Sequence, residues 1–310
     1  MRWVKDGLIY RVCELSDWAW SHAHKPSLLF VQEDRLRIYF GVRDRDNRTR
    51  TTFIDVDPAC PQNVLSVHDR PVLDLGPLGT FDDAGANVSS VLRQDGLVTM
   101  YYTGWNPSRT VPTRNSIGLA VSEDNGLTFR RRFDGPVMDR TIHEPYYTST
   151  PFVLCESGRW RMWHGSGTQW RRIEGKPEIC YHIKYAESAD GVTWERPNLS
   201  CIAPRDDNEA TARASVIREG GVYRMWYCYR RIGGFRDSRE CSYRIGYAES
   251  SDGLAWKRMD DRAGIDVSES GWDSEMIAYP AVYRYRGMLH MIYNGNGFGA
   301  AGFGSAHLDS

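Results

Sequence analysis

The sequence predicts an all-β fold: a five-bladed β-propeller of four-stranded antiparallel blades, closed into a ring by a strand from the N-terminus. A module of alternating apolar residues, an Asp-Gly or Asn-Gly turn and an aromatic residue recurs roughly every 60 residues. Two further strand types precede each copy in a constant order, and tryptophan and tyrosine, which favour strands, are frequent. No linker or low-complexity segment divides the chain, so we expect residues 1–310 to form a single domain.

The first strand type is short and apolar, and we expect it to line the centre of the ring. Its copies are PSLLFV from Pro26, SSVLR from Ser89, PFVLC from Pro151, ASVIR from Ala214 and PAVYR from Pro280. The second strand type follows a tight polar turn and ends in polar residues. Its copies are RIYFGVRD from Arg37, TMYYTGWN from Thr99, RMWHGSG from Arg161, RMWYCYRR from Arg224 and HMIYNGNG from His290.

The third strand type opens the recurring module. Its clear copies are IGLAVSEDNGLTF from Ile117, IKYAESADGVTW from Ile183 and IGYAESSDGLAW from Ile245, with degenerate copies TTFIDVD from Thr51 and FGSAHLD from Phe303. Short fourth strands, PVLDL, PVMDR, CIAP and GIDV, close four units, whereas the fifth unit ends before one. The segment LIYRV near the N-terminus has the character to supply it, and closing the ring would protect the sheet edges. A two-layer β-sandwich is the alternative, but the constant order of strand types favours the propeller.

Charge and composition exclude several classes of partner. The 39 basic and 40 acidic residues leave a net charge of −1, so neither nucleic acid nor a membrane surface is an expected partner. The N-terminus lacks the apolar core of a signal peptide, and no apolar run is long enough to span a bilayer. The seven cysteines are scattered without a C-x-x-C pair, which is typical of reduced thiols in a cytoplasmic protein. No cofactor is predicted.

One face of a propeller collects the loops that feed the inner strands, the ends of the second strands and the starts of the third. The feeding loops carry an acid at a matched place in four units, and we take these as catalytic candidates: Asp83, Glu144, Glu209 and Glu275. Like charges around one ring repel unless a ligand, metal or arginine offsets them. The alternative is that each acid only satisfies backbone N–H groups of its own turn.

Further polar and aromatic residues fall on the same face and are substrate-binding candidates. They are His22, His24, Arg43, Asp44, Asp82, Trp105, Asn106, Arg114, Asn115, His182, Arg213, Arg230, Tyr243, Asn294 and Asn296. Arginine binds carboxylate or phosphate with two parallel hydrogen bonds, so the arginines indicate an anionic ligand, unless they only pair with acids of the protein. His22 and His24 point the same way on a strand, but they lack the spacing of a recognised metal site, and no metal is predicted.

The module A-x-S-x-D-G-x-x-W, with inner strands that open on proline, resembles the five-bladed propellers of glycoside hydrolase families 32, 43, 68 and 130. The segments GVRDRDNRTR, GTFDDAG, YYTGWN, YHIKYAES and GWDSEMIAYP look most like a bacterial glycosyl-hydrolase-like group without an assigned reaction, which accompanies surface-polysaccharide or specialised-metabolite genes.

The sequence departs from the catalytic pattern of family 43. The resemblance implies a base Asp beside the first inner-strand proline, where this protein has Lys25. The second acid corresponds to Ser89 or Ser90, and the third to Ser149 and Thr150. The family triad is therefore not carried over, and the feeding-loop acids remain the candidates.

The leading hypothesis is a carbohydrate-active enzyme that cleaves a glycoside or sugar-phosphate-like substrate, of small-molecule or oligosaccharide size, in the central pocket. Hydrolysis needs a proton donor and an opposed carboxylate, and phosphorolysis would use arginines to hold phosphate. The alternatives are a glycan- or metabolite-binding propeller without catalysis, and a biosynthetic enzyme that performs non-glycosidic chemistry in the same pocket.

Overall fold

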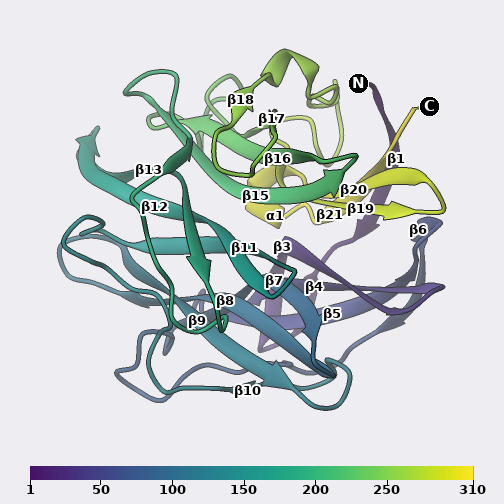
Figure 1. Cartoon of the computed structure of the whole chain (residues 1–310), viewed down its shortest axis with the longest axis horizontal. Coiled ribbons are helices and arrows are strands. Elements are labelled where there is room, and N and C mark those ends of the chain that lie inside the picture. The colour runs from purple at the N-terminus through teal and green to yellow at the C-terminus, as the bar shows by residue number, and fades with distance from the viewer. Residues whose placement is uncertain (310) are drawn as a thin grey trace.

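The computed structural model describes residues 1–309 and is almost entirely β. Four sheets are present within that range, and the nine-stranded sheet consists of two runs joined by a single parallel bridge between Thr49 and Gly85. Divided at this bridge, the strands form five groups that follow one another round a common centre in sequence order (Figure 1). Short helical turns, η1 (Asp260–Arg262) and α1 (Asn296–Gly299), lie between strands of the last two groups.

Neighbouring strands within each group are antiparallel. Group 1 contains β2 (Cys13–Ser16), β3 (Ala19–Gln32), β4 (Arg35–Arg43), β5 (Thr49–Asp57) and β6 (Cys60–Val67). Group 2 contains β7 (Gly85–Gln94), β8 (Leu97–Pro107), β9 (Thr113–Ser122) and β10 (Arg130–Arg131). Group 3 contains β11 (Thr148–Glu156), β12 (Arg159–Ile173), β13 (Lys176–Ser188) and β14 (Ser200–Ile202).

The last two groups follow the same order. Group 4 contains β15 (Glu209–Glu219), β16 (Val222–Arg231), β17 (Arg244–Ser250) and β18 (Lys257–Arg258). Group 5 contains β19 (Ala278–Tyr285), β20 (Met288–Asn294), β21 (Phe303–Leu308) and β1 (Trp3–Tyr10). The first three strand types of each group are thus those that the sequence predicts.

The second strand of each group is covered on both faces. In β4 the consecutive residues Ile38, Tyr39 and Phe40 are each no more than 1% exposed. Successive side chains of a strand point to opposite faces, so both faces of this sheet are packed against neighbours. The hydrophobic core accordingly lies between adjacent groups, where Tyr39 and Phe53 of group 1 pack with Met100 of group 2.

The recurring Asp-Gly or Asp-Asn-Gly turn fastens groups 2, 3 and 4 each to the preceding group. In group 3 the Ser188 hydroxyl donates to Asp190 (2.9 Å) and accepts the Gly191 N–H (2.9 Å), which closes the turn. The Gly191 carbonyl then accepts a hydrogen bond from the buried Tyr101 hydroxyl of group 2 (2.6 Å). Equivalent bonds join Tyr39 to Gly126 (2.7 Å) and Trp163 to Gly253 (3.1 Å). The most visible sequence repeat is therefore a structural contact.

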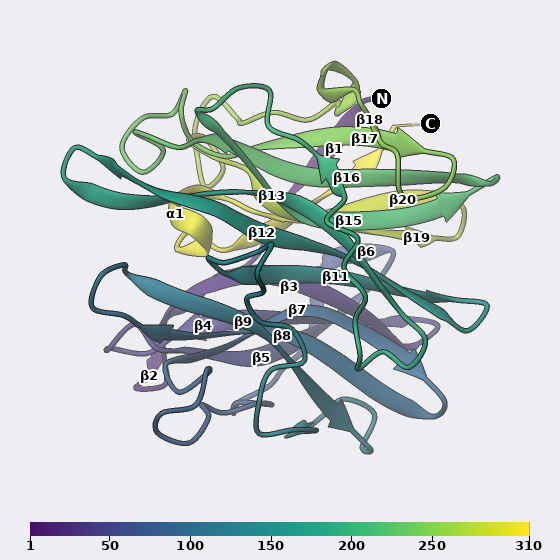
Figure 2. The same ribbon diagram turned by 60° about the vertical axis from the view of Figure 1, so that its left-hand side comes forward.

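The N-terminal strand β1 pairs with the last strand, β21, from Trp3 opposite Leu308 to Tyr10 opposite Phe303. Trp3 also packs edge-on against Trp226 of group 4, with ring centroids 5.8 Å apart. The two ends of the polypeptide accordingly lie near each other in both views (Figures 1 and 2).

The fourth strands differ from those predicted, except that CIAP contributes to β14. PVLDL and PVMDR make only isolated bridges, Leu73 with Thr51 and Met138 with Ile117, and GIDV forms no strand. The outer strands β10 and β18 are two residues long and follow the turn directly, and β6 fills this place in group 1. Outer strands bury few side chains, so their sequences carry little periodic signal.

Every inner strand carries a β-bulge at the same place. The register slips once in β7, β11, β15 and β19, and β3 slips at three places, one of them the equivalent step between His24 and Ser27. In four of these strands a non-glycine residue has a left-handed backbone: Lys25, Thr150, Arg213 and Tyr279, with φ between 45° and 57°. A bulge leaves an extra residue unpaired and turns its side chain away from the regular alternation. These bulges shape the centre of the molecule.

Candidate functional site

A cavity of about 610 Å³, a size typical of small-molecule sites, lies where the inner and second strands of the first four groups meet β19 and α1. Its lining includes His24, Lys25, Arg43, Asn87, Thr103, Trp105, Asn115, Tyr147, Ser149, Thr150, Trp170, Glu178, Tyr181, Ala212, Arg230, Phe235, Arg236, Tyr243, Tyr279 and Phe298.

The bulges bring consecutive side chains to this cavity. In a regular strand His24 and Lys25 would point to opposite faces, yet both line the cavity, as do Ser149 and Thr150. The left-handed backbone at Lys25 (φ 57°) and Thr150 (φ 45°) makes this possible. Such conformations are unfavourable for residues with a Cβ and cluster at functional sites.

Positive charge in the cavity lacks neutralising acids. Lys25, Arg43 and Arg230 line it, and none of the three forms an ion pair with a carboxylate anywhere in residues 1–309. Glu178 is the one acid in the lining, and it pairs with Arg236. Cations removed from water without a counter-charge are costly, so three of them in one cavity are an unusual feature.

The pKa values of Arg43 and Lys25 are both lowered in this cavity. Burial lowers the pKa of Arg43, whose guanidinium donates no hydrogen bond to any described residue. Burial, followed by the charges of Arg213 and Arg43, lowers the pKa of Lys25 to about 8. Burial and Arg43 also hold the pKa of His24 well below its usual range, so this imidazole is neutral near pH 7.

Arg230 is held by aromatic groups. Its Nε donates to the Tyr181 hydroxyl (2.9 Å) and the Tyr243 hydroxyl (3.2 Å), and its guanidinium lies 3.6 Å from the centre of the Phe235 ring. Tyr181 and Tyr243 are hydrogen-bonded to each other. This fixes the guanidinium without neutralising its charge.

Arg213 is also buried and has no ion pair with an acid among residues 1–309, but it lies outside the lining of the large cavity. Its guanidinium donates to the Pro26 and Ser89 carbonyls and to the Ser27 hydroxyl (2.9 Å), which ties β15 to β3 and β7. Burial lowers its pKa to about 10. It lines a smaller, mainly apolar cavity of about 250 Å³ rather than the large one.

Several buried polar atoms of the lining have no hydrogen-bond partner in residues 1–309. They are His24 Nε2, Asn87 Oδ1, Asn115 Oδ1 and Thr150 Oγ1. A Cβ at Gly41 would lie 2.4 Å from Asn87 Oδ1 and 2.7 Å from His24 Nε2, so glycine is required there to make room for both. Buried polar atoms are normally paired, so four unpaired atoms among the residues of one cavity are unusual.

The predicted catalytic acids do not share this cavity. None of Asp83, Glu144, Glu209 and Glu275 is in its lining, so the expectation that they face one pocket is wrong. Buried acids of the feeding loops instead pair with a base of their own group: Asp82 with Arg131 (2.7 Å), Glu144 with Arg196 (3.0 Å), Glu209 with Arg258 (2.6 Å) and Asp273 with Lys5 (2.7 Å).

Asp83 and Glu275 lie outside this set of pairs. Asp83 accepts a hydrogen bond from the Gly79 N–H (2.8 Å) within its own loop. Glu275 is exposed, and its carboxylate contacts no described donor. Neither is placed to act on a ligand in the cavity.

The substrate-binding candidates divide into two sets. Those that line the cavity are His24, Arg43, Trp105, Asn115, Arg230 and Tyr243. Those that do not are His22, Asp44, Asp82, Asn106, Arg114, His182, Arg213, Asn294 and Asn296.

The second set has local roles or faces solvent. Asp44 pairs with Arg48 (2.9 Å), and the amide of Asn294 accepts the Lys25 N–H (2.7 Å) and donates to the Ala23 carbonyl (2.7 Å). Arg114 is exposed.

The remaining members of that set bond within their own neighbourhood. His22 contacts Ser21 (2.9 Å), and burial with the charge of Arg43 lowers its pKa to about 4. His182 contacts Ser200 (3.2 Å), and Asn296 accepts the Glu275 N–H (2.8 Å). Asn106 donates to the Thr80 carbonyl (3.3 Å).

No cluster of His, Cys, Asp and Glu suited to a metal ion occurs between residues 1 and 309. Throughout that range there is also no helix with the length and apolar character needed to cross a bilayer. Its seven cysteines are all free thiols.

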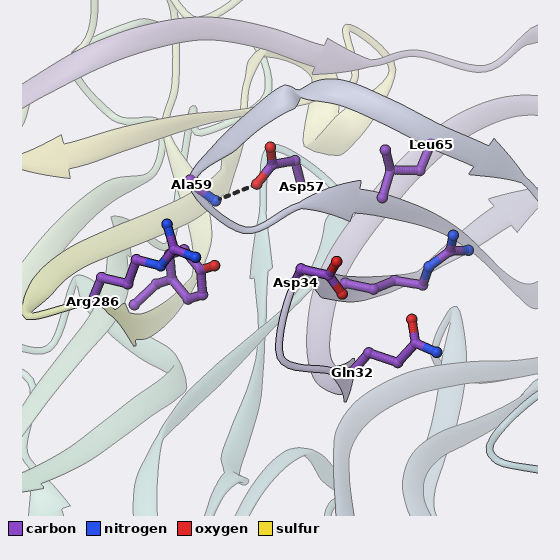
Figure 3. Close-up of a pocket in the computed structure, with 8 residues that line it drawn as sticks. Gln32, Asp34, Asp57, Ala59, Leu65 and Arg286 are labelled. Atoms are coloured by element: carbon purple, nitrogen blue, oxygen red, sulfur yellow. Dashed lines mark hydrogen bonds between the residues drawn. The ribbon is translucent and has the colours of Figure 1, made fainter.

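A separate hollow of about 360 Å³ lies at the opposite end of β4, between hairpin turns of groups 1 and 5 (Figure 3). Its acids Asp34 and Asp57 lie beside the basic Arg35 and Arg286, and the Asp57 carboxylate accepts the Ala59 N–H (2.8 Å). Mixed charge at surface turns does not indicate a ligand of one sign. The large cavity is the candidate site.

Comparison with known proteins defines the family. No family model matches the sequence. Two uncharacterized proteins of Mycobacterium tuberculosis, Rv1502 of strain H37Rv and MT1551 of strain CDC 1551, are each 41% identical to it over 311 residues, which covers 100% of this protein and 100% of each relative. The protein belongs to the family of these mycobacterial proteins.

Solved structures define the fold more broadly. A glycoside hydrolase superposes with a TM-score of 0.73 at 18% identity, covering 98% of this protein and 91% of that one. A thermostable family-43 glycoside hydrolase gives 0.66 at 15% (96% and 91%). The catalytic domain of a GH62 α-L-arabinofuranosidase from Coprinopsis cinerea gives 0.68 at 13% (99% and 96%). The fold is that of the propeller glycoside hydrolases, as the sequence resemblance implies.

Sequence reasoning missed much of the lining. It did not select Asn87, Tyr147, Tyr181 or Tyr279, and it noted Lys25 and Thr150 only as departures from the family acids. The residue before each inner-strand proline was the available signal, since Lys25, Thr150 and Tyr279 all occupy it.

Proposed function

We propose that the five strand groups are the blades of one propeller domain spanning residues 1–310, closed by β1, and that it binds an anionic carbohydrate in the large cavity. An anionic ligand is supported by three basic residues that line the cavity and have no carboxylate partner among residues 1–309: Lys25, Arg43 and Arg230. A sugar acid or sugar phosphate supplies the missing negative charge.

Other features of the lining support a sugar. Trp105 and Trp170 offer flat apolar surfaces to the C–H faces of a ring. The similarity of the fold to that of glycoside hydrolases also supports a carbohydrate-active role.

Hydrolysis by two opposed carboxylates is not the reaction this lining favours. That mechanism needs two acids flanking the bond, and the cavity offers only Glu178, which is already paired with Arg236. Catalysis by Asp83, Glu144, Glu209 and Glu275 would require them to turn into the cavity, which the hydrogen bonds of the first three and the exposed position of Glu275 oppose. Non-glycosidic chemistry on a bound sugar therefore fits better than glycosidic cleavage.

The test compares matched ligands. Glucuronate, galacturonate and glucose 1-phosphate should raise the melting temperature, whereas glucose and galactose should not, because ligands that bind the native state stabilise it. Arg43→Gln should weaken binding by about tenfold or more, the effect of losing a hydrogen bond to a charged group. Arg114→Gln, in an exposed arginine outside the lining, is the matched control and should bind normally.

Two results would contradict the proposal. One is equal stabilisation by neutral and anionic sugars, and the other is equal weakening by the Arg43 and Arg114 variants.

A further inference from the structure

Lys25 differs from every other lysine of the protein. There are five lysines: Lys5, Lys25, Lys176, Lys184 and Lys257. Lys5 pairs with Asp273 (2.7 Å), and the Lys184 amine donates to the Asn198 side chain (2.7 Å). Lys176 and Lys257 are exposed to solvent.

The Lys25 amine, in contrast, lines the cavity without an acceptor. Its backbone N–H donates to Asn294 (2.7 Å), which anchors the left-handed turn of the backbone at this residue. Its Nζ lies 5.8 Å from the centre of the Tyr279 ring and makes no hydrogen bond or ion pair within residues 1–309. Lys25 thus brings an amine without a described partner to the wall of the cavity, beside Tyr279, which also lines it.

The surroundings raise the share of the neutral form of this amine. Burial disfavours an ammonium ion there, and the charges of Arg213 and Arg43 repel it further, so the pKa falls to about 8. The other titratable groups that face it are the neutral His24, Tyr279 and the Cys228 thiol, which are not anions near pH 7. A buried lysine beside another cation is the usual setting of a nucleophilic amine.

We propose that Lys25 is the nucleophile of this cavity, where its amine forms an imine with an aldehyde or ketone that carries a carboxylate or phosphate group. The nitrogen lone pair attacks the carbonyl carbon, and the carbonyl oxygen takes a proton to give a carbinolamine. Loss of a proton from nitrogen and of hydroxide from carbon releases one water and leaves the C=N bond. The anionic group of the ligand rests on the proposed function; the reactivity of the amine does not.

Arg43 is the group placed to hold the anionic end. It lines the cavity from the end of β4, opposite the β3 segment that carries His24, and its guanidinium has no partner among the described residues. The ligand therefore needs a carbonyl group for Lys25 and an anionic group for Arg43. An open-chain sugar acid or a 2-oxo acid meets both requirements.

Reductive trapping tests the proposal without knowledge of the natural substrate. The full-length protein is incubated at pH 7.5 with glyoxylate, pyruvate or neutral glycolaldehyde together with cyanoborohydride, and the adduct is located by peptide mass mapping. We expect glyoxylate and pyruvate to label Lys25 at least about tenfold faster than the exposed Lys176 or Lys257, because a lowered pKa makes the Lys25 amine the stronger nucleophile near neutral pH. Lys25→Arg keeps the charge and should lose the fast adduct, whereas Lys176→Met should keep it.

The outcomes separate the nucleophile from the ligand class. Labelling of Lys25 no faster than that of Lys176 and Lys257 would overturn the proposal, even if sugar acids still stabilise the protein, in which case the proposed function stands. Fast labelling by glycolaldehyde that equals labelling by glyoxylate, and that Arg43→Gln leaves unchanged, would overturn the anionic part. Selective slowing of the glyoxylate reaction in Arg43→Gln supports the proposal in full.

Discussion

Replacing Glu209 by glutamine distinguishes a structural acid from a catalytic one. Glu209 begins β15 with its side chain 4% exposed, and its carboxylate binds both terminal nitrogens of Arg258 (2.6 and 2.8 Å) and the Arg205 N–H (2.7 Å). The amide keeps the shape but removes the charge, and it turns an NH₂ group toward the guanidinium. The variant should therefore lose stability and keep ligand binding.

The contacts set the size of the effect. Breaking a buried ion pair on one side typically costs about 3–5 kcal/mol. Arg258 retains Asp260 (2.7 Å) and is 16% exposed, so we expect Glu209→Gln to lower the free energy of unfolding by about 2–3 kcal/mol, less than for a fully isolated pair. Urea unfolding followed by tryptophan fluorescence measures this difference.

Glu275→Gln is the matched control, because this acid is exposed and unpaired in the described structure. It should change stability by less than about 0.5 kcal/mol. The reasoning would be refuted if Glu209→Gln unfolded like the parent protein but lost turnover or ligand binding. Such a result would mean that Glu209 acts in catalysis or ligand binding rather than in stability.

Three further predictions concern the fold. Tyr101→Phe leaves the Gly191 carbonyl without its partner and should cost about 1–3 kcal/mol, whereas Tyr146→Phe, in an exposed tyrosine without a hydrogen bond among the described residues, should cost nothing measurable in the same unfolding assay. Burial lowers the pKa of His164 to about 4 from its usual 6.5, so the unfolded protein binds more protons than the folded protein between these two pH values. The free energy of unfolding should therefore fall as the pH drops from 6.5 to 4, and it should fall less steeply in His164→Gln. Removing residues 1–12 exposes the edge of β21 and uncovers Trp226, and should lower the melting temperature sharply; an unchanged melting temperature would contradict closure by β1.

The sequence was sufficient to predict the strand order because propeller repeats leave a periodic signal. Tyr39, Tyr101 and Trp163 occupy one place in successive units and each bonds the turn of the next group. Contacts of this kind recur because each group meets the same neighbours. The outer strands, which bury little, carried no comparable pattern.

The same regularity misled the prediction of the site. Acids at matched places were interpreted as a ring around a ligand, but Asp82, Glu144 and Glu209 recur because each group needs the same internal ion pair. A single ligand contacts each group differently, so the residues that bind it break the repeat. Lys25 does so, since no other group places a lysine before its inner-strand segment, and only group 4, with Arg230, repeats the arginine of Arg43.

Side-chain direction was the other obstacle. A strand pattern assigns alternate residues to opposite faces, and a bulge reverses that assignment without a reliable mark in the sequence. His24 was predicted to face the pocket and Lys25 was not, yet both line it. Arg213 was predicted as a ligand contact, but it lies outside the lining of the large cavity and donates hydrogen bonds to the Pro26 and Ser89 carbonyls.

A crystal structure of the protein with a bound sugar acid tests the central claim most directly. We predict that the carboxylate of glucuronate or galacturonate lies within hydrogen-bonding distance, about 2.7–3.2 Å, of the Arg43 guanidinium, with the sugar ring inside the large cavity. A sugar bound with its hydroxyl groups toward Arg43 and its carboxylate in solvent would contradict the claim, as would a sugar seated in the hollow of Figure 3.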